Sequence, residues 1–179
     1  AAETSSPWIA GLTQAVEECR SEQGLTRKPV FYLHGAAGMG KRHIAQAVAE
    51  RLGLPLMVVD SVALMAAALP WRQAWTLLFR EGLLTPAVLY LRDVDRVLQG
   101  EEAAARLQWL TRSVADLGGV TFLAGETPWS WPATLEECLF LTIDVGGHDA
   151  EAYQHAWQRE MATIDTVSAT ELSTVTNQY

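Results

Sequence analysis

Short apolar runs that alternate with amphipathic helical segments constrain the fold of this chain more than any other feature. The apolar runs are four to seven residues long and cover residues 30–33, 56–59, 87–91, 120–124 and 139–145. Apolar residues recur at helical spacing around them, at residues 7–23, 41–52, 62–69, 71–79, 103–117 and 150–161. Continuous apolar strands joined by helices are typical of parallel sheets buried on both faces. The sequence therefore predicts an α/β fold, a three-layer α/β/α sandwich with a five-stranded parallel sheet.

The composition excludes several classes of protein. The chain has 21 Asp and Glu against 13 Lys and Arg, and its net charge of −8 argues against binding to duplex DNA or to an anionic membrane. No apolar run approaches the roughly 20 residues of a membrane span, and the first residues lack the pattern of a signal peptide. Cys19 and Cys138 are too few for a disulfide framework or a zinc site. We therefore expect a cytoplasmic protein that binds neither nucleic acid nor membranes.

A glycine-rich motif follows the first apolar run and precedes a helix. Its residues are Gly35, Ala36, Ala37, Gly38, Met39, Gly40 and Lys41, the G-x-x-x-x-G-K pattern of a phosphate-binding loop. Glycines let successive backbone N–H groups converge on an anion, the helix N-terminus adds positive partial charge, and the lysine reaches the outer phosphates. We therefore expect residues 35–43, which end with Arg42 and His43, to bind the phosphates of ATP or ADP.

Two positions that would serve a magnesium ion carry arginine. A phosphate loop normally continues with Ser or Thr, whose hydroxyl binds Mg²⁺, but here Arg42 follows the lysine. In phosphate-loop NTPases the corresponding strand is followed by an aspartate that binds Mg²⁺ and often by a glutamate that polarises water. Here Arg92 occupies the aspartate position, and Asp93 occupies the glutamate position as the remnant of the catalytic acid. We expect no metal site; the alternative is a one-residue shift that makes Asp93 the metal ligand. Arg92 and Arg96 either pair with Asp93 and Asp95 or contact phosphate.

The motifs, taken in order, resemble the large subdomain of an AAA+ ATPase. Besides the phosphate loop, the resemblance rests on residues 89–95 (Leu-Tyr-Leu-Arg-Asp-Val-Asp), residues 122–128 (Phe-Leu-Ala-Gly-Glu-Thr-Pro) and residues 143–149 (Ile-Asp-Val-Gly-Gly-His-Asp). In detail the chain looks most like bacterial tandem AAA+ proteins, some of which accompany contractile injection systems.

The resemblance implies a division of the chain into three parts. Residues 1–24 would form a lead-in helix, and residues 25–161 the nucleotide-binding subdomain. Residues 162–179 would begin a linker or lid that is truncated, so we expect a domain excised from a longer chain.

Two further family positions depart from the pattern. The family's polar residue at the end of the fourth strand corresponds to Glu126, an anion that would repel a γ-phosphate. The family's arginine finger would lie between residues 127 and 141, yet residues 113–158 contain neither Lys nor Arg. A finger contributes about 10³- to 10⁵-fold in rate where it is present. We therefore expect hydrolysis that is very slow or absent.

These observations predict an ATP- or ADP-binding AAA+ domain that acts as a structural or regulatory module of a ring-forming ATPase. The resemblance implies other AAA+ subunits, in a ring that is typically hexameric, and a protein substrate or assembly as partners. Two alternatives stay open. One is an active Mg²⁺-dependent ATPase in which Asp93 or Asp95 serves the metal, and the other is a protein-interaction scaffold that binds no nucleotide.

Overall fold

The computed structural model describes residues 7–19, 27–117, 119–129 and 138–146, all of which belong to one compact unit that ends at Gly146. Its helices are α1 (Pro7–Cys19), α2 (Lys41–Arg51), α3 (Ser61–Met65), α4 (Trp71–Leu84), α5 (Val94–Val97) and α6 (Ala103–Leu117). Its strands are β1 (Lys28–His34), β2 (Leu56–Asp60), β3 (Val88–Arg92), β4 (Thr121–Gly125) and β5 (Cys138–Asp144).

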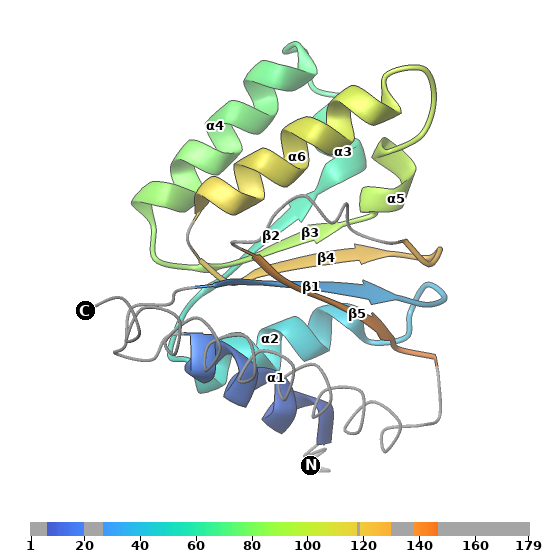
Figure 1. Ribbon diagram of the computed structural model, residues 1–179. Helices are drawn as coiled ribbons and strands as arrows, with labels where there is room; N and C mark the ends of the chain where they lie inside the picture. The colour runs from blue at the N-terminus through green and yellow to red at the C-terminus, as the bar shows by residue number, and fades with distance from the viewer. Residues whose placement is uncertain (1–6, 20–26, 118, 130–137, 147–179) are drawn as a thin grey trace, which may run out of the picture. The chain divides into compact units, whose positions relative to one another are not determined.

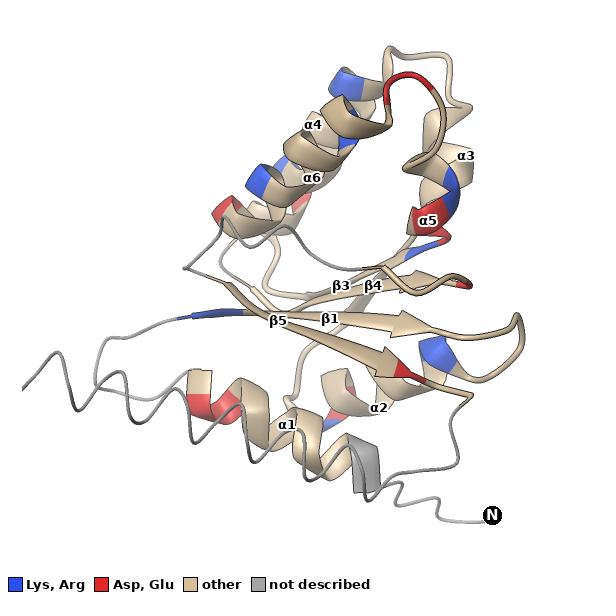
Figure 2. Ribbon diagram, turned by 45° about the vertical axis from the view of Figure 1, so that its right-hand side comes forward, with Lys and Arg blue, Asp and Glu red and all other residues tan. Residues whose placement is uncertain are grey.

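The strands of the described chain lie parallel in one sheet with the order β2-β3-β4-β1-β5. The chain moves outward from β1 to β2 and then returns through β3 to β4. Right-handed crossovers therefore require α2 on one face and α4 and α6 on the other. Figure 1 and Figure 2 show α1 and α2 under one face and α3 to α6 over the opposite face. The predicted three-layer α/β arrangement with a five-stranded parallel sheet is confirmed, and the strands' carboxyl ends share one edge.

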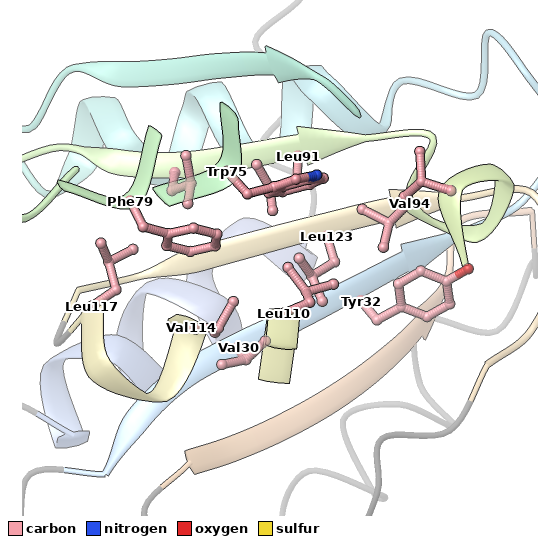
Figure 3. Packing of buried hydrophobic residues seen from close by; sticks show 12 residues of the cluster. Val30, Tyr32, Trp75, Phe79, Leu91, Val94, Leu110, Val114, Leu117 and Leu123 are labelled. Carbon is pink, nitrogen blue, oxygen red and sulfur yellow. The ribbon is translucent and has the colours of Figure 1, made fainter. Parts of the chain in front are cut away.

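Side chains on both faces of the sheet are buried. On the α4 and α6 side the core contains Val30, Tyr32, Leu89, Leu91, Leu123, Trp75, Phe79, Leu110 and Val114 (Figure 3). Residues that alternate with these along the strands, such as Phe31 and Phe122, point toward the other face, and their ring centroids are 4.9 Å apart. Burial on both faces explains why the strands are continuous apolar runs.

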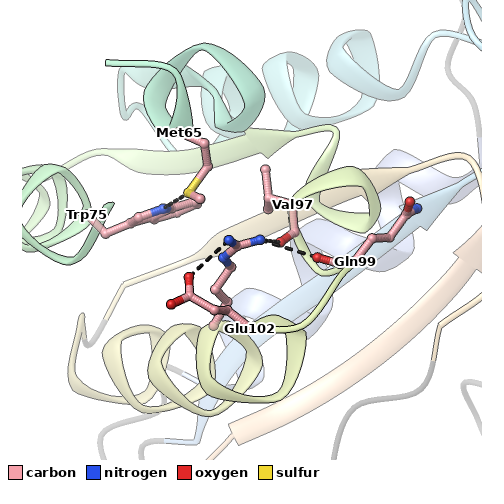
Figure 4. A network of polar contacts seen from close by, with 6 residues as sticks. Met65, Trp75, Val97, Gln99 and Glu102 are labelled. Atoms are coloured by element: carbon pink, nitrogen blue, oxygen red, sulfur yellow. Dashed lines mark hydrogen bonds and ion pairs between the residues drawn. The ribbon is translucent and has the colours of Figure 1, made fainter. Parts of the chain in front are cut away.

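An arginine of α6 holds the short helix α5 and the turn that follows it. Arg106 Nη1 donates hydrogen bonds to the carbonyl oxygens of Val97 (3.2 Å) and Gln99 (3.3 Å), and Nη2 lies 3.1 Å from Glu102 Oε2 (Figure 4). A helix of four residues is unstable alone, so α5 depends on such tertiary bonds and on the burial of Val94.

Two elements differ from the sequence prediction. The segment at residues 62–69 is helical only in α3, which Asp60 caps by accepting the Ala63 N–H at 2.9 Å. Pro70 disfavours helical geometry at the residue before it, and α4 begins just after it. The short α5 was not predicted, because four residues carry no periodicity. The helix predicted at residues 150–161 and the tail at 162–179 lie outside the described residues.

Candidate functional site

Three glycines determine the shape of the loop between β1 and α2. Gly35, Gly38 and Gly40 have φ values of +140°, +83° and +82°, which side chains other than glycine's rarely adopt. Gly35 also lies against the end of β5, where a Cβ atom would be 3.3 Å from the backbone nitrogen of Gly146. The spacing of the glycines in the motif is therefore what permits this loop conformation.

The start of α2 presents groups that suit an anion. Gly40 caps the helix without a side-chain hydrogen bond. Within the described part of the chain, the N–H groups of Arg42 and His43 have no acceptor. Lys41 Nζ donates hydrogen bonds to the carbonyl oxygens of Gly35 and Ala36, the latter at 3.0 Å, so its ammonium group lies over the loop. Free N–H groups at a helix N-terminus beside a lysine can bind phosphate.

A charged network occupies the ends of β2 and β3. Arg92 Nη2 lies 3.3 Å from Asp60 Oδ2, and Arg92 Nε donates a hydrogen bond of 2.9 Å to Asp93 Oδ2. Asp60 and Arg92 are register partners on adjacent strands, so their side chains share one face of the sheet. Asp93 has φ +56° and ψ +37°, a left-handed conformation that aspartate tolerates. One guanidinium thus compensates two carboxylates.

The buried Tyr90 connects this network electrostatically with α2. Its burial and then the negative charge of Asp93 raise the pKa of Tyr90 to about 12, whereas the positive charges of Arg92 and Arg42 lower it. Arg42 therefore lies close enough to act on the same hydroxyl as Arg92 and Asp93. Figure 2 shows basic residues at the start of α2, and acidic and basic residues between β3 and α5, at the same edge of the sheet.

The residues at this edge do not fit a magnesium ion, which requires oxygen ligands. The two positions where the family resemblance implies a hydroxyl and a carboxylate carry Arg42 and Arg92, which are cations. The nearest carboxylates, Asp60 and Asp93, are already paired with Arg92. In addition, no group of three or more His, Cys, Asp or Glu side chains that could hold a metal occurs among the described residues.

Asp95, on the first turn of α5, joins the ends of β3 and β4. Its Oδ2 atom accepts hydrogen bonds from the backbone N–H of Glu126 (2.8 Å), from that of Thr127 (3.2 Å) and from the Thr127 hydroxyl (3.2 Å). Tyr32 Oη donates to the carbonyl oxygen of Thr127 at 2.6 Å. The sequence predicts Asp95 either as an alternative metal ligand or as part of a local ion-pair cluster, because contacts over 31 residues leave no local pattern. Asp95 instead positions the loop after β4.

Replacing Asp95 with alanine should destabilise the protein by about 1–3 kcal/mol, because two backbone N–H groups lose their acceptor. Asp95→Asn retains one accepting oxygen and should cost less. Urea unfolding measures both effects. The control is Glu101→Ala, at an exposed turn, which should change stability by no more than about 0.5 kcal/mol. An Asp95→Ala protein as stable as the control would contradict this positioning role.

The structure brings some predicted residues together and leaves others apart. Arg42, Arg92 and Asp93 share the carboxyl edge with the phosphate loop, whereas the exposed Glu126 is bound there only through its backbone N–H. The stretch expected to contain an arginine finger is described at residues 127–129 and 138–141. Its residues 130–137 lie outside the described residues.

No protein-family model and no curated protein matches this sequence. Within the described residues, none of the helices combines the length and hydropathy needed to cross a membrane.

Proposed function

We propose that this chain is a nucleotide-binding domain of the AAA+ type that binds ATP or ADP through residues 35–43 and hydrolyses ATP very slowly or not at all. The observation that carries the proposal is the loop conformation, with three glycines at positive φ, free N–H groups at the start of α2 and Lys41 over the loop. In this proposal the domain is a structural or regulatory module that assembles with other subunits in a ring.

The strand order supports an AAA+-type domain over other doubly wound α/β folds. In the dinucleotide-binding and flavodoxin orders, the first two strands in sequence are neighbours. Here β3 and β4 lie between β1 and β2. In this order one strand, β4, separates the end of β3 from β1 and its phosphate loop, so Arg92 and Asp93 can face a ligand held there.

The charges at the site favour binding over hydrolysis. Hydrolysis requires groups that activate water and neutralise the developing charge. Asp93, the only remnant of a catalytic acid, is hydrogen bonded to Arg92, and Asp95 is bound to the loop after β4. A metal at either carboxylate would have to compete with these bonds, which favours the proposed loss of hydrolysis over an active ATPase with rearranged ligands.

Two measurements on the purified chain test the proposal. Isothermal titration with ADP and with ATP should show saturable binding at one site. A phosphate-release assay should show turnover no faster than a sample without protein. Turnover at a rate typical of an ATPase would refute the proposal that ATP hydrolysis has been lost. An absence of binding to either nucleotide would refute the nucleotide site itself and favour the interaction scaffold.

A further inference from the structure

The guanidinium of Arg92 lies between two carboxylates and compensates their negative charge. It bridges Asp60 and Asp93 with distances of 3.3 and 2.9 Å. Both oxygens of Asp60 already have partners, because Oδ2 pairs with Arg92 and Oδ1 caps α3 by accepting the Ala63 N–H. A divalent cation at this position would have to displace a guanidinium and face its positive charge.

Arg42 adds a second guanidinium at the carboxyl edge of the sheet, where α2 begins. It lies in the first turn of α2, is exposed, and has no ion-pair partner among the described residues. Its charge acts on the Tyr90 hydroxyl together with that of Arg92. Lys41, Arg42 and Arg92 are therefore three cations at the edge of the sheet that carries the phosphate loop, and of these Arg92 is paired with Asp60 and Asp93.

We propose, resting on the nucleotide site proposed above, that Arg42 and Arg92 take the place of the magnesium ion and that the site selects metal-free nucleoside di- and triphosphates. A free polyphosphate carries more negative charge than its magnesium complex, so it interacts more favourably with the cationic groups of Lys41, Arg42 and Arg92. Guanidinium groups also bind phosphate oxygens in a bidentate geometry. Magnesium in solution forms a complex with the nucleotide and lowers the concentration of the metal-free form, so it weakens binding to this site. In a standard phosphate-loop site magnesium would strengthen binding.

The test is a titration of the chain with ADP and ATP, in excess EDTA and in excess Mg²⁺, at equal ionic strength because exposed charges are screened. We expect Kd to be about tenfold higher in Mg²⁺, which corresponds to about 1.4 kcal/mol. Binding that is stronger in Mg²⁺ would overturn this inference and leave the nucleotide site intact. Binding in neither condition would overturn the proposed function instead.

A double variant tests the two arginines directly. Arg42→Thr with Arg92→Asp supplies the hydroxyl and carboxylate that Mg²⁺ prefers, so its binding should become stronger in Mg²⁺. The matched control, Arg51→Thr with Arg80→Asp, makes the same charge change at exposed residues of α2 and α4 and should keep the weakening by Mg²⁺. If the double variant folds and Mg²⁺ weakens its nucleotide binding as much as that of the unmodified chain, Arg42 and Arg92 do not take the place of magnesium.

The single variant Arg42→Thr keeps the inference testable if the double variant does not fold. It retains the Arg92 ion pairs and removes only the exposed guanidinium. Its binding in EDTA should weaken about tenfold, because a charge-assisted contact with phosphate is lost. Unchanged binding in EDTA would exclude Arg42 from the site.

Discussion

Replacing Lys41 with alanine should weaken ADP binding about 100-fold, the largest effect expected of any single substitution at the phosphate loop. The ammonium group lies over the loop, where its hydrogen bonds go to the carbonyl oxygens of Gly35 and Ala36. A bound phosphate would replace these carbonyls as the acceptor. Hydrogen bonds to a charged group contribute about 1.5–3 kcal/mol each, so the loss of about 3 kcal/mol corresponds to that factor. Isothermal titration measures it.

The control for this variant is Arg51→Ala at the opposite end of α2. It removes one positive charge from the same helix, far from the N–H groups that face the ligand, so ADP affinity should stay the same. Thermal unfolding without nucleotide shows whether the Lys41→Ala loop is intact. If Arg51→Ala lowered the affinity for ADP as much as Lys41→Ala, the effect would come from the net charge of the protein and not from a contact with phosphate. If Lys41→Ala bound ADP as tightly as the unmodified chain, the ligand would bind elsewhere.

The sequence was sufficient to predict the elements that carry their own local pattern. Buried strands appear as apolar runs because both faces of the sheet are covered, and the glycines of the loop are spaced as positive φ values require. The phosphate loop could therefore be placed between a strand and a helix before its conformation was known. Its role as a nucleotide site remains a prediction.

Contacts between distant segments could not be predicted, because periodicity says nothing about which strands become neighbours. Asp60 and Arg92 pair across 32 residues only because β2 lies beside β3. The predicted local cluster was right for Arg92 and Asp93. It was wrong for Asp95, which bonds to the loop after β4, and Arg96 shows no ion pair in the described residues. Only the tertiary structure shows that the carboxylates beside Arg92 already pair with it.

Replacing Gly125 with alanine should destabilise the protein by about 3 kcal/mol, the upper end of the cost of overpacking. Gly125 ends β4, where a Cβ atom would lie 2.7 Å from Asp95 Cγ and also collide with Tyr32 Oη. Neither neighbour can move easily, because the Tyr32 ring is buried and Asp95 holds the loop after β4. Urea unfolding measures the loss. As a control, Gly11→Ala within α1 meets no atom within 4 Å and should stabilise the helix by up to about 1 kcal/mol.

A double-mutant cycle identifies the cause of that loss. Tyr32→Phe removes the hydroxyl that a Cβ atom at Gly125 would meet, at the cost of the hydrogen bond to the Thr127 carbonyl. If steric overlap destabilises Gly125→Ala, the double variant should be more stable than the sum of the single effects predicts, by about 1 kcal/mol. Additive effects would show that the hydroxyl does not limit the space at Gly125. The loss would then come from the collision with Asp95, because a Cβ atom at Gly125 would still lie 2.7 Å from Asp95 Cγ.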